Sequence, residues 1–546
     1  MVAMPRTHLA ARAVALAVVA LTLPMGAMAV PTITDILNNS SGTPRGLPNY
    51  GIAPSSIFIV TGTGLADPGT PTLQNTQAPG GLPLTLNGAS ITVIVNGVTT
   101  HPALYYTSPT QLAAVLPAAT PIGTGTLTVT YNGTTSAAAV MQVVASAVGF
   151  NHFNQVPVPL GKYDANVDIG VATDNSTGAL LTFTNSGTPG EIIVLWATGL
   201  GADPADSDTA YSSSPHAVNT PLQIYFGGVP ATILYQGSAG YPGVNQIDVT
   251  IPASALTGCY VPLVAVTGTV VSNSVMFPVH PGGGDCVEQS QGTQLTGTQI
   301  LKGAQDTLKT GTLNLGLTSG PNGTAVNIDA AFENTSGLLA AATGRAGVIS
   351  PGGCAVWPAV VGGPLTFTGL DPGSITITGP AALSLTLASQ GVKGAYGANL
   401  AGSTIPSTGG TFTFKGSGGT SGATDVGSFT SVVTFTNPII TWSNKNIAAS
   451  VDRTQGLTFT WVGGNPGTYV ILGGSSVAAG TTVGFTCRVL VDGGQFTVPS
   501  YILLGMPTGA GSTTIQHQVV STFQATGLDT TLTTGAIEYR VSTTFK

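Results

Sequence analysis

Charged residues are scarce in this chain. Only 6% of its 546 residues are Asp, Glu, Lys or Arg, whereas an ordinary soluble domain has about 25%. The 14 basic residues are scattered, and the formal net charge is −7, so no basic stripe is present to follow a phosphate backbone. Nucleic acid is therefore not an expected partner. The shortage of Lys and Glu also leaves little material for long charged helical faces.

Cysteine is equally sparse, with four residues at Cys259, Cys286, Cys354 and Cys487. No CxxC motif or paired histidine accompanies them, which argues against zinc. An even number in an exported chain favours disulfides, and three connectivities are possible. Cys259 and Cys286 lie near each other, and the other two both lie in the last third of the chain. We therefore favour Cys259–Cys286 and Cys354–Cys487.

Long apolar runs are missing except for a short one near the start. Arg6 and Arg12 are followed by the apolar run Ala13–Met25 and by Ala27-Met28-Ala29, which is typical of a signal peptide cleaved after Ala29. No later stretch reaches the roughly 18 apolar residues that a spanning helix needs. We expect an extracellular or cell-surface protein with no membrane span after cleavage.

Glycine and short β-branched residues are abundant instead. The chain has 75 Gly and 37 Pro, and turn pairs such as Asn96-Gly97, Asn132-Gly133 and Gly227-Gly228 separate apolar runs of five to seven residues. Asn-Gly and Gly-Gly pairs between such runs are strong hairpin signals. The composition predicts an all-β protein built of short strands.

One stretch is repeated. The segment "APSSIFIVTGTGL" from Ala53 returns as "TPGEIIVLWATGL" from Thr188, and Pro54 and Leu65 recur 135 residues later as Pro189 and Leu200. Later strands recur in the same order, so a whole domain of about 100 residues is duplicated, as a two-sheet sandwich. Both alternating sets of "EIIVLWATGL" are apolar. That strand is either buried on both faces or packed on a neighbouring domain.

The part after Cys286 alternates apolar residues with Thr or Ser, as half-buried antiparallel strands do. Leu457, Phe459 and Trp461 are expected to face inward, and a short helix is possible near Ile300. We predict two tandem immunoglobulin-like β-sandwiches followed by a larger β-sandwich or jelly-roll-like domain. The predicted division is a signal peptide 1–29, module 1 at 30–148, module 2 at 149–280, a Gly-rich linker 281–286 and a C-terminal β domain 287–546.

The segments "IAPSSIFIVTGTGLADP", "YYTSPTQLAAVLP", "GTPGEIIVLWATGLGADP" and "VNQIDVTIPASALTGCYVPLVAV" carry a resemblance. They resemble the paired IPT/TIG-like, immunoglobulin-like modules of a family of uncharacterised exported acidobacterial proteins, over roughly residues 50–279. The resemblance implies an immunoglobulin-like fold with a β segment behind it. It implies no particular activity.

Groups that could carry out catalysis do not cluster in the sequence. The histidines after the signal peptide are isolated, and there is no HExxH or G-x-S-x-G motif. The glutamates fall in different predicted elements, which argues against a glycosidase pair. We expect no catalytic residue, no cofactor and no metal site. The histidines are His101, His152, His216, His280 and His517, and the glutamates are Glu191, Glu288, Glu333 and Glu538.

Three weaker patterns suggest binding. Gly416–Gly427 lacks the Lys of a phosphate-binding loop and favours a flexible hairpin. The loop with Asp203, Asp206 and Asp208 could offer oxygen ligands to calcium, although its spacing fits no EF-hand and solvated acidic turns are common. Several tyrosines could stack on sugar rings or simply cap the sandwich core: Tyr105, Tyr106, Tyr211, Tyr235 and Tyr241.

These patterns together predict an exported structural or adhesive β protein. An extracellular glycan or another polymer of the cell surface or matrix is the candidate partner. The alternative is an extracellular polysaccharide-acting enzyme, or its accessory module, with its site in residues 287–546.

Overall fold

The computed structural model describes residues 30–69, 72–74, 80–155, 168–290, 293–305, 307–336, 349–358, 367–420, 422 and 425–546. The fold is nearly all β, with 53% of residues in strands and 5% in helices. Within the described ranges, no helix is both long and apolar enough to cross a membrane. The expected signal peptide and its cleavage site lie outside the described residues.

The first β unit comprises strands β1 to β11 and consists of two sheets that enclose one apolar core. One sheet has the order β1-β2-β8-β7-β3, and the other has the order β10-β9-β5-β4 with β11 beside β9 and β6 beside β5. The strands are β1 Thr32–Asn38, β2 Ile57–Thr63, β3 Thr72–Leu73, β4 Thr85–Leu86, β5 Ala89–Val95, β6 Val98–Thr100, β7 Ala103–Thr107, β8 Gln111–Val115, β9 Gly123–Tyr131, β10 Thr134–Thr135 and β11 Ala139–Val143.

The second β unit comprises β12 to β23. It has a sheet β12-β16-β20-β19 with β15 beside β16, a sheet β18-β17-β21-β22 with β23 beside β21, and the small pair β13-β14. Its strands are β12 Gly149–Phe150, β13 His152–Asn154, β14 Asp168–Gly170, β15 Ala172–Asp174, β16 Ile192–Thr198, β17 Gln223–Phe226, β18 Val229–Pro230, β19 Thr232–Ser238, β20 Asn245–Thr250, β21 Gly258–Thr267, β22 Val270–Val271 and β23 Val275–Val279.

The duplication read from the sequence is present in the fold. The order β1-β2-β8-β7 of the first unit matches β12-β16-β20-β19 of the second. A register shift between Leu104 and Tyr106 recurs between Ile233 and Tyr235. Ser136 and Ser272 each accept a hydrogen bond from the backbone N–H seven residues earlier. Irregular details of this kind recur only where a whole fold has been copied.

The repeated strand β16 is buried on both faces for most of its length. Ile193, Val194 and Leu195 are buried, while Ile192 at its start is exposed. The strand ends at Gly199, whose φ of +98° and closeness to the Ala147 carbonyl leave no room for a side chain. The turn therefore lets the strand end against the first β unit.

A short segment connects the second unit to the rest of the chain. It holds the paired strands β24 Val287–Ser290 and β25 Thr293–Thr296 and the helix α1 Gly297–Gln305. The helix expected near Ile300 is therefore present. The predicted linker 281–286 is held to the second unit, because the N–H and the hydroxyl of Ser186 both donate to the Gly284 carbonyl.

The C-terminal β unit comprises β26 to β43. Its sheets are an 11-stranded one ordered β28-β40-β39-β42-β43-β26-β27-β33-β32 with β29 and β37 at its sides, a four-stranded one ordered β31-β30-β34-β35, and a three-stranded one ordered β36-β38-β41. The only parallel pairings are β26 with β43 and β37 with β43, among the described strands.

The elements of this unit are β26 Thr307–Gly320, β27 Gly323–Ser336, β28 Cys354–Pro358, β29 Phe367–Gly369, β30 Ile375–Gly379, β31 Leu383–Thr386, β32 Ala388–Ser389, β33 Ala395–Ala401, η2 Gly402–Thr404, β34 Gly410–Gly416, β35 Phe429–Phe435, β36 Thr441–Trp442, η3 Lys445–Ala449, β37 Ser450–Val451, β38 Leu457–Val462, β39 Tyr469–Ala478, β40 Thr481–Leu490, η4 Val491–Gly493, β41 Gln495–Val498, α3 Ser500–Leu504, β42 Gly509–Ser521 and β43 Thr530–Phe545.

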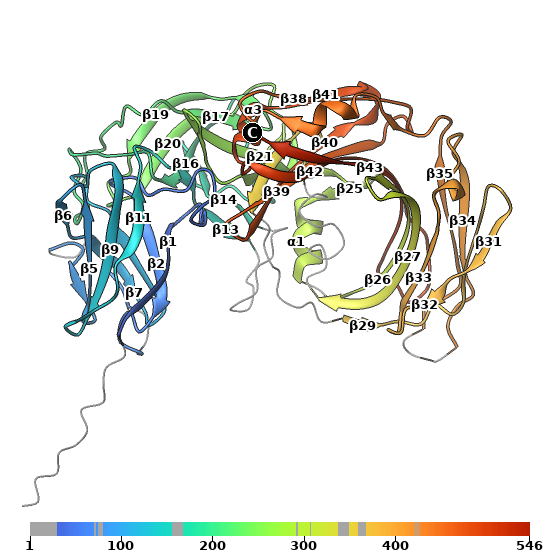
Figure 1. Ribbon diagram of the computed structural model, residues 1–546, viewed down its shortest axis with the longest axis horizontal. Helices are drawn as coiled ribbons and strands as arrows, with labels where there is room; N and C mark the ends of the chain where they lie inside the picture. Colours follow the sequence, from blue (N-terminus) through green and yellow to red (C-terminus); the bar gives the residue numbers. More distant parts are fainter. Residues whose placement is uncertain are drawn as a thin grey trace, which may run out of the picture.

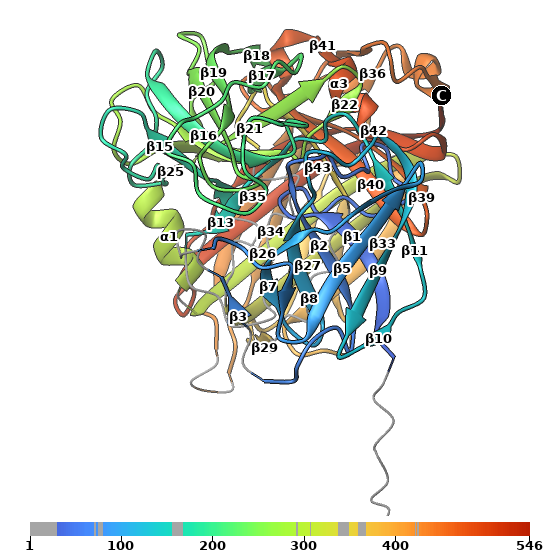
Figure 2. The same ribbon diagram turned by 90° about the vertical axis from the view of Figure 1, so that its left-hand side faces the viewer.

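One apolar core joins the three sheets of the C-terminal unit. Leu457, Phe459 and Trp461 are buried in it, as the alternation predicted. Figure 1 shows the first unit in blue and the C-terminal unit in yellow to red, on either side of the green second unit. Figure 2 views the same arrangement from the side of the first unit, with β5 and β9 in front. The second unit therefore lies between the first unit and the C-terminal unit.

Candidate functional site: the junction of the three β units

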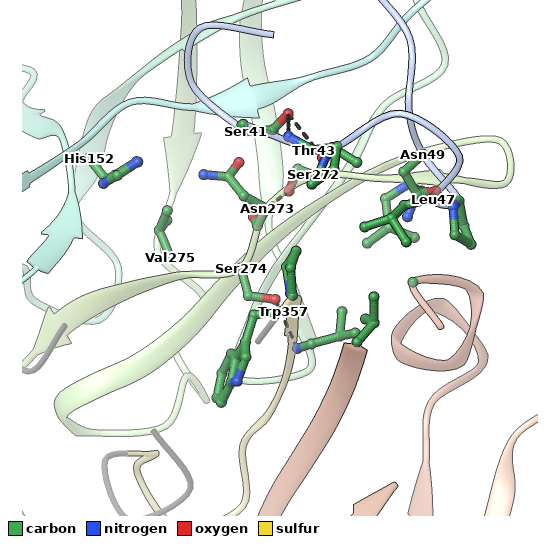
Figure 3. A pocket seen from close by; sticks show the side chains of 18 of the residues that line it. Ser41, Thr43, Leu47, Asn49, His152, Ser272, Asn273, Ser274, Val275 and Trp357 are labelled. Carbon is green, nitrogen blue, oxygen red and sulfur yellow. Dashed lines mark hydrogen bonds between the residues drawn. The ribbon is translucent and has the colours of Figure 1, made fainter. Parts of the chain in front are cut away.

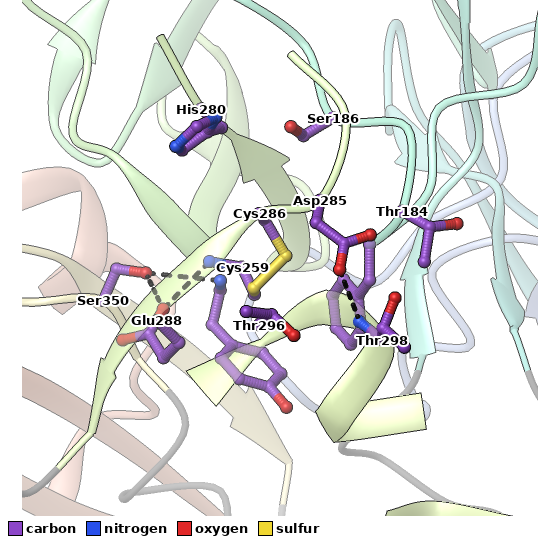
Figure 4. The surroundings of a disulfide bond; sticks show 12 residues. Thr184, Ser186, Cys259, His280, Asp285, Cys286, Glu288, Thr296, Thr298 and Ser350 are labelled. Atoms are coloured by element: carbon purple, nitrogen blue, oxygen red, sulfur yellow. Dashed lines mark hydrogen bonds between the residues drawn. A yellow bond between two sulfur atoms is a disulfide. The ribbon is translucent and has the colours of Figure 1, made fainter. Parts of the chain in front are cut away.

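The Cys259–Cys286 disulfide lies where the second unit meets the connecting segment (Figure 4). Cys259 is in β21, Cys286 precedes β24, and both are fully buried. The second disulfide joins Cys354 of β28 to Cys487 of β40, which are directly paired across the sheet. These are the pairs that the sequence positions favoured. Because the four sulfurs form two disulfides, none is a thiolate that could bind zinc.

A buried ion pair lies beside the first disulfide. The side chains of Glu288 in β24 and Arg488 in β40 are each 3% exposed, and Arg488 Nη1 is 3.5 Å from Glu288 Oε1. Glu288 Oε2 accepts hydrogen bonds from the Cys259 N–H at 2.9 Å and from the Ser350 hydroxyl at 2.7 Å. Burial raises the pKa of Glu288, against the opposing effects of Ser350 and Arg488. One carboxylate thus ties the second unit to two segments of the C-terminal part.

Arg488 has further partners around this pair. Its guanidinium carbon lies 4.0 Å from the centre of the Tyr469 ring, and its Nη1 donates to the Ile349 carbonyl at 3.3 Å. Burial lowers the pKa of Arg488, and Glu288 opposes this. A side chain at Gly258, where φ is +152°, would collide with Ser350 and Glu288. The cluster is therefore closely packed on every side.

The first unit reaches the C-terminal unit through the loop after β1. Leu47 in this loop is only 7% exposed and belongs to the apolar core of the C-terminal unit. The neighbouring Asn49 accepts the Val271 N–H of the second unit at 3.0 Å. A single loop of the first unit thus contacts both of the other units.

A cavity of about 380 Å³ lies at this three-way junction (Figure 3). Its wall includes Leu47, Val275 and Trp357, and the contact of His152 Nδ1 with Asp168 Oδ2, at 2.9 Å, lies at its edge. Its volume is in the range of small-molecule sites. Several polar groups on the wall are used between the units; Ser274, for example, accepts the Val356 N–H at 3.2 Å. This cavity is therefore part of the junction between the three units.

The three aspartates considered as calcium ligands belong to the contact between the first and second units. Both oxygens of Asp208 accept the Ala118 N–H, at 3.0 and 3.2 Å, and the Asp203 N–H donates to Ser55 Oγ at 3.0 Å. Asp206 Oδ2 accepts a hydrogen bond from the Ser238 hydroxyl, which belongs to the same unit. In the described ranges no group of three or more His, Cys, Asp or Glu residues could hold a metal ion. The loop joins the units, and its geometry does not support the calcium interpretation.

The candidate tyrosines separate into two groups. Tyr105, Tyr106 and Tyr235 lie within strands, and Tyr105 donates from its hydroxyl to the Pro242 carbonyl across the contact between the first two units, at 2.9 Å. Tyr211 and Tyr241 lie in loops, are 42% and 39% exposed, and form an edge-to-face pair with ring centroids 5.0 Å apart. Only this pair has the exposure that the sugar-stacking interpretation requires.

The glutamates and histidines are dispersed over the fold. Glu191 accepts the Thr188 N–H in the turn before β16, Glu288 is buried at the junction, and Glu333 and Glu538 lie on β27 and β43. His101 is exposed, His216 and His280 lie in loops of the second unit, and His152 pairs with Asp168. The strands β34 and β35, on either side of the segment considered as a phosphate-binding loop, are paired antiparallel; residues 421, 423 and 424 lie outside the described residues.

His517 in β42 is fully buried in the C-terminal core. Its Nε2 accepts the Asn465 N–H at 3.2 Å and lies 2.8 Å from Thr468 Oγ1. Its Nδ1 has no hydrogen-bond partner. Burial lowers the pKa of His517 to about 4. The imidazole is therefore neutral in the folded protein at neutral pH.

This environment makes stability depend on pH. The unfolded chain gains a proton on this histidine near pH 6.5 and the folded one near pH 4, so stability is complete above about pH 6.5 and falls as the pH drops. We expect a loss of about 3 kcal/mol by pH 4 from this group. The free energy of unfolding, measured with urea between pH 7 and pH 4, should fall less steeply with decreasing pH for His517→Gln than for the control His101→Gln. Equal slopes for the two variants would contradict the assignment.

Sequence reasoning did not find the Glu288–Arg488 pair or the role of Leu47. A local signal exists for Arg488, which is the single charge in the apolar strand "VGFTCRVLV". A charge in such a strand needs a buried partner. Nothing in the sequence around Leu47 distinguishes it from other loop leucines.

No family model matches the chain, and no curated protein matches it. Among solved structures, the plexin A4 extracellular region is 9% identical, with 84% of this chain and 34% of that chain covered and a TM-score of 0.13. The tetra-tandem repeat from the extending region of a large adhesion protein is 11% identical, covering 93% and 98%, with a TM-score of 0.12. SGBP-B of the Bacteroides ovatus mixed-linkage glucan utilization locus, in complex with a mixed-linkage heptasaccharide, is 12% identical, covering 80% and 94%, also with a TM-score of 0.12. Similarity at these TM-scores shows neither a shared arrangement of the whole chain nor a shared function.

Proposed function

We propose that this protein is an exported scaffold without catalytic activity, which has a structural or adhesive role at the cell surface or in the surrounding matrix. The observation that carries the proposal is the junction itself. Leu47 of the first unit is buried in the core of the C-terminal unit, and Glu288 before that unit binds both the second unit and Arg488. Three β units held in this way present their outer faces in fixed directions.

Export is supported by the two disulfides and by the signal-like start of the sequence. Disulfides persist in oxidising compartments such as the cell exterior. Both bonds are buried, so they stabilise the fold and are poorly placed for redox exchange. A non-catalytic role is supported by the dispersal of the glutamates and histidines over separate elements.

The test is whether the mature chain behaves as one rigid body. Small-angle X-ray scattering should fit a single arrangement of the three units, and limited proteolysis should not cut at residues 281–286. A scattering profile that requires several relative orientations of the units, or rapid cleavage at this segment, would refute the scaffold. Hydrolysis of polysaccharides by the purified mature protein would support the enzyme alternative.

Loss of the Leu47 contact should loosen the first unit. Leu47→Ala removes most of a side chain that is only 7% exposed, and we expect a loss of about 3 kcal/mol from the docking of this loop. Amide hydrogen exchange should then speed up in residues 39–50. The matched control is Leu180→Ala, because Leu180 is 41% exposed. Equal exchange in the two variants would show that the loop does not fix the first unit.

A further inference from the structure

One face of the 11-stranded sheet is polar over β42, β43, β26, β27 and β33, beyond the part at β28 and β40 that packs on the junction. Figure 1 shows the sheet bending around β26 and β27, with β34 and β35 outside the bend and α1 inside it. The apolar side chains of β26, such as Leu313, Leu315 and Leu317, are buried in the core on the outer side. Because side chains alternate along a strand, Asn314, Gly316 and Thr318 face the inside of the bend.

The register of the strands defines rows across this inner face. One row runs Gln518, Ala536, Gly316, Asn327 and Asn399 over β42, β43, β26, β27 and β33. Small residues occupy its centre, and a Cβ added at Gly316 would meet nothing within 4 Å. The row is therefore an open floor flanked by carboxamide side chains, and beyond Gln518 the register continues to Tyr469 of β39. We call this surface, made by the residues of this row together with Gln516, Glu538 and Arg540, the polar trough.

The side chains beside the floor are held in place by one another. Gln518 Nε2 donates to Gln516 Oε1 at 2.7 Å, Gln516 Nε2 donates to Glu538 Oε2 at 3.3 Å, and Arg540 Nη2 donates to Glu538 Oε1 at 3.0 Å. A bonded chain on rigid strands positions donors and acceptors before a ligand arrives. Since Arg540 compensates the charge of Glu538, the chain as a whole is neutral.

A hollow of about 450 Å³ adjoins this chain. Thr318, Asn327, Glu538 and Arg540 line it together with the turn at residues 320–325 between β26 and β27. The hollow gives the trough depth at the end where the Glu538–Arg540 pair lies. The Glu538 side chain is 17% exposed and that of Arg540 is 53% exposed, so both remain accessible.

We propose that the polar trough binds a neutral polysaccharide chain, an activity that goes beyond the scaffold role. Sugar hydroxyls both donate and accept hydrogen bonds, and carboxamides offer both functions on one planar group. A carboxylate accepts from neighbouring hydroxyls with two oxygens. The small floor residues allow a sugar ring to approach the backbone. The compensated charge suits a neutral ligand and offers no cluster of cations to a polyanion.

The experiment measures binding of the mature full chain to a soluble neutral β-glucan, a neutral galactomannan and the polyanion alginate, by affinity electrophoresis and calorimetry. We expect binding to at least one neutral polymer and none to alginate, with little change at high salt. Gly316→Val should abolish binding by filling the floor, while leaving the melting temperature unchanged or raised, because β-branched residues favour strands. Glu538→Ala should weaken binding by about tenfold.

Two controls locate the site. Thr378→Val places the same residue on the outward face of β30, and Tyr211→Ala with Tyr241→Ala removes the exposed aromatic pair; both should bind as the unaltered chain does. Equal binding by Gly316→Val, loss of binding in the tyrosine variant alone, preference for alginate, or no binding to either neutral polymer would each overturn the proposal. None of these outcomes bears on the scattering test, so the scaffold can stand if the trough fails.

Discussion

Replacing Arg488 by methionine is expected to lower the free energy of unfolding by about 4 kcal/mol at neutral pH. The substitution removes the guanidinium beside Glu288, whose side chain is 3% exposed, and so leaves a buried carboxylate without this counter-charge. Methionine keeps most of the apolar volume, which limits the cavity contribution. Urea unfolding followed by fluorescence measures the loss directly.

The matched control is an exposed ion pair of the same chemistry. Arg45→Met breaks the contact with Asp35. The side chains of Arg45 and Asp35 are 36% and 26% exposed, and surface pairs contribute only about 0–1 kcal/mol. The double variant Glu288→Gln with Arg488→Met should recover much of the loss. Glutamine still offers an oxygen to the Cys259 N–H, and no buried charge remains.

The pH dependence of this variant provides a second readout. Burial already raises the pKa of Glu288 against the opposing effect of Arg488, so removing the arginine should raise that pKa further. A folded-state pKa above the unfolded value favours folding at low pH, where the carboxyl is protonated, and this advantage is lost as the pH rises. The deficit of Arg488→Met should therefore shrink from pH 7 to pH 5. A deficit that is small at pH 7 or independent of pH would contradict the buried-charge explanation.

Strand periodicity and the repeat were readable from the sequence because they depend on local pattern. Alternation placed Leu457, Phe459 and Trp461 inside, and the repeated Thr-Gly-Leu turn marked the end of β16. The conformation of a tight turn is set by residues that are close in sequence, and glycine marks positions where positive φ is required. The all-β class and the copied topology follow from these local rules.

The junction could not be read in the same way because it joins residues far apart in the chain. Glu288 meets Arg488 across 200 positions, and Asp208 meets Ala118 across 90. Such pairings are fixed by how the units pack against one another, and no short-range sequence pattern encodes these pairings. The acidic loop shows the same limit, because its sequence cannot reveal that Asp208 accepts the Ala118 N–H of the first unit and Asp206 the Ser238 hydroxyl of its own unit.

The polar trough was missed for a different reason. It is made of ordinary polar and small residues of long strands, such as Asn327 of β27 and Gln516 and Gln518 of β42. Only the order of the strands brings Gln518, Gly316 and Asn399 into one row. Aromatic rings are the usual sign of sugar binding in a sequence, and none of the residues that define the trough is aromatic.

Loss of the Cys354–Cys487 disulfide is expected to have the largest effect of any change described. It closes 133 residues, whereas Cys259–Cys286 closes 27. A longer closed loop restricts the unfolded chain more, so Cys354→Ala with Cys487→Ala should lose about 5 kcal/mol and Cys259→Ala with Cys286→Ala about 3.5 kcal/mol. Each pair of Cys→Ala changes serves as the other's control, because all four side chains are buried.

The two variants should also differ in how steeply urea unfolds them. Freed of the 133-residue loop, the unfolded chain expands and exposes more surface, so the urea dependence of the unfolding free energy should increase most for Cys354→Ala with Cys487→Ala. Reducing agent added to the unaltered chain under unfolding conditions should reproduce the summed losses. If the short-loop variant were the less stable of the two, native packing around Cys259 would outweigh restriction of the unfolded state, and the loop-length explanation would be wrong.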